Sequence, residues 1–101
     1  RYDYDVMIMS DDKQKENEEK IVKSITVLQS VADSNITPRN IRKIVKESMV
    51  MLQDKTLSQG VRAANAISML DEVSQDPNMP SYARVTIWNA VSTLESVREV
   101  V

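Results

Sequence analysis

Apolar residues recur along most of the chain at spacings of three and four positions, which places their side chains on one face of a helix. A polar stretch over 10–20 leads into the first such series, which predicts a helix over about 12–33. The apolar members of this series are Ile21, Val22, Ile25, Leu28, Val31 and Ala32. Three further series predict helices over about 38–53, from 58 to the turn before Pro77, and from 81 to about 98. Strand patterns are absent beyond the first nine residues, so the chain is predicted to be all-α.

Prolines mark the starts of two of these helices. Pro38 follows one turn-rich segment and Pro80 follows another, and each stands where a helix is predicted to begin. A proline at the first helical position loses no hydrogen bond, because the N–H group it lacks has no partner there in any helix. Pro38 and Pro80 are therefore assigned structural roles.

The chain contains an internal repeat with an offset of 42 positions. Similar residues follow the same register, including Val45 with Ile87 and Met49 with Val91. Each repeat predicts a helix, a turn, a proline and a second helix, so the chain reads as two tandem helical hairpins over about 12–53 and 58–98. Six identities carry the register: Ile25 with Ile67, Leu28 with Leu70, Val31 with Val73, Pro38 with Pro80, Arg42 with Arg84, and Leu52 with Leu94.

Two hairpins joined by short links favour an antiparallel four-helix up-and-down bundle, forming one domain over 11–101. A short solenoid is the alternative, because a period of 42 falls within the range of HEAT-like repeats. The bundle is favoured, since two repeats are too few to bury a continuous solenoid core. Residues 1–10 alternate apolar and polar positions, and they are expected to form an extended arm or a poorly ordered tail.

Composition removes several classes of chemistry. The 101 residues include no His, no Cys and one Gly. These counts exclude disulfides, imidazole bases, thiolate nucleophiles, the usual zinc ligands and glycine-rich phosphate loops. Asp71, Glu72 and Asp76 lie close together in sequence but do not follow a calcium-loop pattern. We therefore predict no catalytic residue, no metal site and no cofactor, and we do not expect an enzyme.

Net charge and hydropathy bear on location and partners. The formal charge is -2, so any binding to nucleic acid would need a local basic patch. No run of about 18 apolar residues occurs, so no membrane-spanning segment is predicted. The cytoplasm is the expected location.

Several stretches of the second hairpin resemble an uncharacterised family of small archaeal proteins. The resemblance covers roughly residues 18–95, and its more specific pieces are D-P-N-M-P at 76–80 and I-W-N at 87–89. It also includes 60–64 and 67–74. This resemblance implies a compact four-helix domain in an archaeal cytoplasm, and it implies no established activity.

Four basic residues of the second helix share one face, at positions i, i+3, i+4 and i+7. They are Arg39, Arg42, Lys43 and Lys46. This face is a candidate contact for an anion or for nucleic acid, although no aromatic residues are interleaved for base stacking. The alternative is a solvated face whose charges pair with acidic neighbours such as Glu47, Asp33 or Glu19.

Two residues of the fourth helix are assigned structural roles. Arg84 is equivalent by repeat to Arg42, and its guanidinium is expected to tie the helix to a loop carbonyl or to a carboxylate such as Asp71 or Glu72. Trp88 lies amid apolar residues and is expected to be a core anchor rather than a ligand platform.

Further residues bear on association. Asn65 and Asn89 are expected to be buried amides that fix helix register. Apolar residues off the clearest core faces predict surface for a partner: Met51, Met79, Val50, Val85 and Val97. The leading hypothesis is a non-enzymatic interaction module, either a homo-oligomer or a subunit that docks on another protein through its second and fourth helices. The alternative is a nucleic-acid or ribosome-associated accessory factor that uses the basic face.

Overall fold

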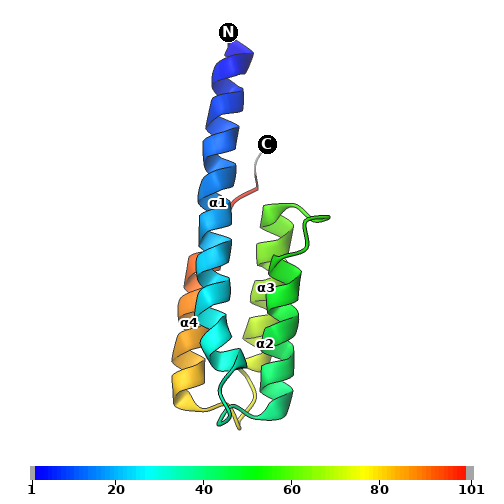
Figure 1. Ribbon diagram of the computed structural model, residues 1–101, viewed down its shortest axis with the longest axis vertical. Helices are drawn as coiled ribbons and strands as arrows, with labels where there is room; N and C mark the ends of the chain where they lie inside the picture. Colours follow the sequence, from blue (N-terminus) through cyan, green and yellow to red (C-terminus); the bar gives the residue numbers. More distant parts are fainter. Residues whose placement is uncertain (1, 100–101) are drawn as a thin grey trace.

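A computed structural model describes the backbone of residues 2–99 and the side chains of residues 11–99. The described chain forms four helices and no strand (Figure 1). Their bounds are α1 Tyr2–Ala32, α2 Arg39–Leu52, α3 Gln59–Val73 and α4 Ser81–Leu94. The predicted all-α fold with four helices is therefore confirmed.

The helices alternate in direction and close into a bundle (Figure 1). The two helices of each hairpin pack together, and α1 also packs along α4. Contact between the first and last helices closes the structure, as a bundle requires and a two-repeat solenoid does not. Within the described residues, α2 and α4 do not touch, so they lie on opposite sides of the bundle.

Repeat-equivalent residues fill the core from both hairpins. Leu28 and Leu70, Leu52 and Leu94, and Val45 and Ile87 are all buried. Because these pairs keep the register of 42 positions, the same apolar face is buried in each half of the chain. The repeat in the sequence is thus a repeat in the packing.

Local signals set the starts of the shorter helices. The Ser58 Oγ accepts a hydrogen bond from the Val61 amide at 3.3 Å, so Ser58 caps α3. Pro38 and Pro80 occupy the N-cap positions of α2 and α4 and not the first helical positions, so each helix begins one residue after its proline. Their carbonyls accept the first helical bonds, from the amides of Arg42 at 3.0 Å and Arg84 at 3.1 Å.

Helix α1 begins much earlier than the sequence pattern predicts. Residues 2–10 are helical, which corrects the expectation of an extended arm at this end, and Arg1 lies outside the described residues. No Gly or Pro interrupts the segment, so a helix nucleated in the bundle propagates outward at one hydrogen bond per residue. At about 1.5 Å per residue, α1 is about 46 Å long and its amino-terminal part projects beyond the other helices (Figure 1).

None of the helices in the described part of the chain is long and apolar enough to cross a bilayer.

Candidate functional site

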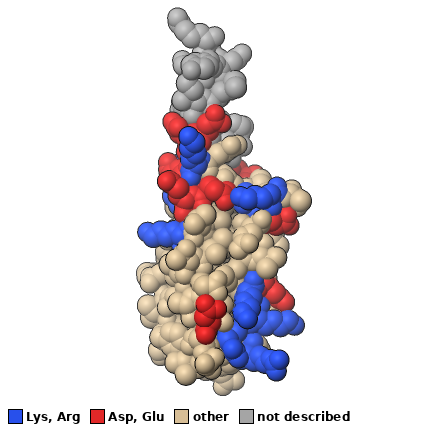
Figure 2. Space-filling model, viewed as in Figure 1, with Lys and Arg blue, Asp and Glu red and all other residues tan. Residues whose placement is uncertain are grey.

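The basic residues predicted on one face of the second helix lie together on the surface. Helix α2 buries Ile41, Val45 and Leu52, and this rotation directs the opposite face to solvent. We call the four basic side chains of that face the α2 cationic surface: Arg39, Arg42, Lys43 and Lys46. Arg42 is half-buried and the other three are exposed. Figure 2 shows basic side chains gathered over this part of the bundle, while acidic ones concentrate around α1.

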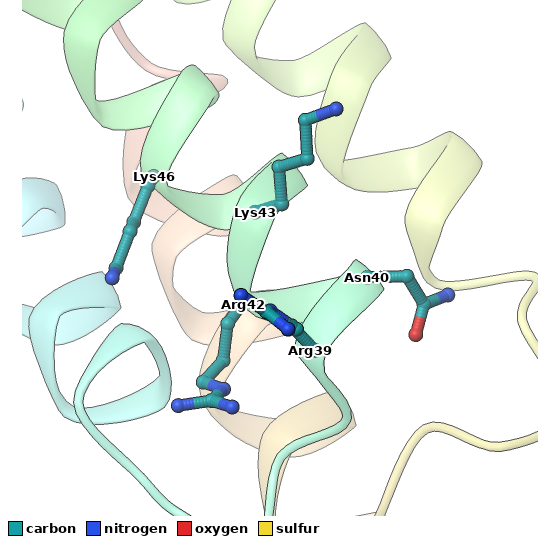
Figure 3. A pocket seen from close by; sticks show the side chains of 5 residues that line it. All are labelled: Arg39, Asn40, Arg42, Lys43 and Lys46. Carbon is teal, nitrogen blue, oxygen red and sulfur yellow. The ribbon is translucent and has the colours of Figure 1, made fainter.

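These four side chains line one hollow together with Asn40. Figure 3 shows Arg42 and Lys46 on the side of α1 and Lys43 on the side of α3. The Asn40 amide donates a hydrogen bond to Asp76 Oδ2 at 2.9 Å, which ties α2 to the turn before α4. The hollow is open to solvent, so it suits an extended anionic surface better than an enclosed small molecule.

The α2 cationic surface is not neutralised by neighbouring carboxylates. Helix α2 holds four of the 13 basic residues and one of the 15 acidic residues, which gives it a charge of +3 in a protein of charge -2. Among the described side chains, the ion pairs are Lys13–Glu16, Lys20–Glu16, Lys55–Glu18 and Arg62–Glu18. All of them lie around α1, and the alternative of pairing with Glu47, Asp33 or Glu19 is not found among those side chains.

Arg42 and Arg84 occupy equivalent places in the two hairpins but differ in their bonding. Arg84 Nη1 donates a hydrogen bond to the carbonyl of Ser74, the C-cap of α3, which is the kind of loop carbonyl contact that the sequence predicts. Arg42 Nε is buried and has no hydrogen-bond partner within residues 11–99. Arg84 therefore makes a structural hydrogen bond in the second hairpin, whereas Nε of its counterpart Arg42 makes none in the first.

An apolar groove adjoins the cationic surface. It runs between α2 and α3, where Val50, Met51 and Met69 supply the apolar lining. Lys43 and Lys46 lie at one end, and Glu47 and Asp54 also border the groove. Val50 is 69% exposed, as the prediction of excess apolar surface requires, and Met51 is half-buried.

The outer face of α4 is apolar, and the core role predicted for Trp88 is wrong. Trp88 is 67% exposed, and Val85, one turn earlier, is 59% exposed. We call these two residues the α4 apolar stripe. Ile87 and Val91 are buried, and Trp88 follows Ile87 by about 100° around the helix, which turns it away from the core. The repeat register could have predicted that Trp88 is exposed, because it pairs Trp88 with Lys46, which is also exposed.

The predictions of exposure or burial for four other residues are wrong. Met79 and Val97 are only 6% and 7% exposed, so both belong to the core and not to a partner surface. Each lies outside a helix, in the turn before α4 or in the segment after it, but its side chain packs in the core cluster. Asn65 and Asn89 are exposed, which corrects the prediction that they are buried amides.

The sequence pattern did not predict which polar residues are buried. They include Asn17, Ser24, Thr37, Ser48 and Arg62. Arg62 donates to the carbonyls of Leu52 and Leu57, both at 3.1 Å, so it closes the connection between α2 and α3. Asn17 Nδ2 lies 3.1 Å from Gln59 Oε1, and these two residues are exactly one repeat apart in sequence. The repeat register could have indicated this pair, because polar residues at equivalent positions on the inward faces of the two hairpins point at one another.

Within residues 11–99, no cluster of three or more His, Cys, Asp or Glu side chains is placed to hold a metal ion.

Comparison with known proteins points to one family. A sequence profile described as "Uncharacterised protein family (UPF0147)" matches residues 8–97. A UPF0147 protein of Metallosphaera sedula is 52% identical over 84 residues, covering 83% of this chain and 94% of that protein. A UPF0147 protein of Aeropyrum pernix is 49% identical over 84 residues, covering 83% and 92%.

Two crystal structures resemble the bundle. One is of a protein from the uncharacterised family UPF0147 from Thermoplasma acidophilum, with a TM-score of 0.76 and 27% identity over 83% of this chain and 99% of that one. The other is of a protein of unknown function, with a TM-score of 0.77 and 35% identity over 79% of this chain and 91% of that one.

Proposed function

The chain belongs to the uncharacterised protein family UPF0147, whose matched relatives are archaeal, and we propose that it is a non-enzymatic helical interaction module. In this proposal it associates with a second copy of itself through the α4 apolar stripe. The observation that carries the proposal is the exposure of Trp88 beside Val85 on the outer face of α4.

An exposed tryptophan supports a protein interface. Tryptophan is enriched among the residues whose truncation costs most at interfaces, because its large flat side chain buries much apolar area with few rotatable bonds. The bundle leaves this side chain in solvent, so its burial gain is still available to a partner.

The charge of α4 favours a second copy as that partner. Arg84 is the one charged residue between Ser81 and Leu94. A two-fold interface sets the same patch against itself, so an uncharged stripe meets its copy without like-charge repulsion. Helix α2 carries +3, and its cationic surface would repel its own copy.

A binding role also suits the chemistry of the side chains. With no His and no Cys in the sequence, the chain lacks imidazole bases and thiolate nucleophiles. The hollows beside α2 are open to solvent and do not exclude water as catalytic sites do. We propose that the module acts in the cytoplasm, which cell fractionation with immunodetection would test.

Sedimentation equilibrium of the full chain tests self-association. We expect the wild type to dimerise and Trp88→Ser to raise the dimer dissociation constant at least about 30-fold, the effect of losing about 2 kcal/mol. Val50→Ser removes an equally exposed apolar side chain from α2 and should leave the constant within about threefold. A wild type that stays monomeric to about 1 mM, or two variants with equal effects, would overturn the proposal.

A further inference from the structure

The α2 cationic surface has the spacing of a polyanion site. Arg39 and Lys46 are seven residues apart, which is about 10 Å along a helix. Phosphates of one nucleic-acid strand follow each other at about 3.4 Å along the duplex axis, so this length spans about three such spacings and faces about four phosphates. Because the four side chains line a single open hollow, they present their charges to one surface and not to scattered ligands.

Arg42 contributes a donor that the fold does not use. Its repeat counterpart Arg84 donates to the Ser74 carbonyl, whereas Arg42 Nε is buried and without a partner within residues 11–99. A buried donor without an acceptor is unfavourable, and no hydrogen bond at Nε holds this half-buried side chain in place, so it can turn toward an anion that supplies the acceptor. Guanidinium groups suit phosphate because their planar donors match two of its oxygens at once.

The repeat supplies an internal comparison for the whole surface. Positions 39, 43 and 46 of α2 correspond to Ser81, Val85 and Trp88 of α4. The same outward positions are thus cationic in one hairpin and polar or apolar in the other, although the buried positions agree. Since the fold is satisfied by either set, the cations of α2 are not required for packing.

The surroundings favour a nucleic acid over an acidic protein. An acidic amphipathic helix would need apolar side chains between the cations, but the hollow is lined by Arg, Lys and Asn, whose aliphatic stems supply its apolar surface. The apolar groove next to it is bordered by Glu47 and Asp54, which would repel acidic side chains. The lining residues also include no aromatic ring to stack on unpaired bases, which favours a duplex over a single strand.

We infer that the α2 cationic surface binds the phosphate backbone of double-helical nucleic acid, without reading base sequence. This site lies on the opposite side of the bundle from the α4 apolar stripe, so it does not depend on self-association through α4. RNA and DNA duplexes offer the same phosphate chemistry, and the binding test includes both.

Fluorescence anisotropy with a labelled RNA duplex and a labelled DNA duplex tests the inference at about 50 mM salt. With four phosphate contacts, log K should fall against log salt with a slope of about -3.6. The double variant Lys43→Glu/Lys46→Glu should bind at least about tenfold more weakly, and its slope should be closer to about -1.8. Tighter binding of one duplex type would support the inference and identify that nucleic acid as the ligand.

The matched control is Lys15→Glu/Lys23→Glu, which changes net charge equally at exposed lysines of α1. It should weaken binding less than about threefold. Equal loss in both double variants would show a general charge effect and overturn the site. No binding to either duplex, equal affinity for a single strand, or displacement by polyglutamate at equal charge would each overturn the inference. Unchanged helical circular dichroism in both variants establishes that a loss is not unfolding.

Discussion

Asn17 of α1 and Gln59 of α3 are equivalent residues of the two hairpins, and they are hydrogen-bonded to each other across the bundle. Helices α1 and α3 run in the same direction (Figure 1), so their equivalent inward positions meet beside the axis that relates the hairpins. Asn17 is fully buried, and its Nδ2 also donates to the carbonyl of Arg98 at 2.7 Å. One amide therefore joins α1, α3 and the segment after α4.

Replacing Asn17 with Ala should destabilise the bundle by about 1–3 kcal/mol, because the Arg98 carbonyl and Gln59 lose their partner. For a domain of this size, that loss lowers the melting temperature by about 4–8 °C per kcal/mol, which thermal unfolding by circular dichroism measures. Asn89→Ala removes an exposed amide and should change stability by less than about 0.5 kcal/mol. Equal losses would show that the buried network does not stabilise the fold.

Adjacent residues of α4 should respond in opposite ways to truncation. Ile87 is buried among the core side chains, so Ile87→Ala should cost about 2–5 kcal/mol. Trp88 faces solvent, so Trp88→Ala should cost less than about 0.5 kcal/mol in the monomer. Urea unfolding at low protein concentration measures both. A larger loss for Trp88 would mean that α4 is rotated by one residue relative to this structure.

Arg84 should matter more to stability than Lys46. Arg84→Ala removes the hydrogen bond to the Ser74 carbonyl, which joins the two helices of the second hairpin. The side chain is exposed, so the expected cost is about 1 kcal/mol, which is below the range of about 1.5–3 kcal/mol for hydrogen bonds that involve charged groups. Lys46→Ala breaks no intramolecular bond found in residues 11–99 and should cost less than about 0.5 kcal/mol. Thermal unfolding that gives the reverse order would reject the structural role of Arg84.

The repeat made much of the fold predictable. Identical apolar residues at one offset, such as Leu28 with Leu70, required two similar hairpins, and the prolines marked where two helices start. The extent of α1 was harder to predict, because polar and alternating residues without Gly or Pro permit helix without requiring it. The local composition does not indicate that a helix starts near Tyr2. The helix extends that far because the segment continues the part of α1 that packs in the bundle.

The candidate sites show the same difference between what the local sequence predicts and what depends on tertiary contacts. The charges of α2 could be predicted because surface residues at helical spacing need no tertiary information. Trp88 could not be placed by its hydrophobicity, since an aromatic residue suits both a core and an interface. Asn17 became visible only through its partners, because the burial of an amide depends on acceptors and donors from α3 and the end of the chain.

Glu18 of α1 contacts both α3 and the turn that joins α2 to α3. Its Oε2 is 2.9 Å from Lys55 Nζ, and its Oε1 is 3.1 Å from Gln59 Nε2 and 3.7 Å from Arg62 Nη1. Burial acts to raise the pKa of Glu18, but it is outweighed by the hydrogen bonds from Lys55 and Gln59 and by the positive charges of Lys55 and Arg62. The pKa of Glu18 therefore lies below its ordinary value of 4.5.

A lowered pKa makes the contribution of Glu18 to stability depend on pH. The unfolded chain binds the proton more readily than the folded one, so the contribution is complete well above pH 4.5 and is lost as pH falls through the folded pKa. Glu18→Gln should therefore cost stability near neutral pH, by less than about 1 kcal/mol because solvent screens the partly exposed pair. Urea unfolding at about pH 7 and about pH 3 should show the difference from wild type shrinking in acid. Glu19→Gln, at an exposed neighbouring position, makes the same change of net charge and is the control. A wild-type advantage over Glu18→Gln that persists undiminished in acid would contradict this account, because ionised Glu18 could not then be its source.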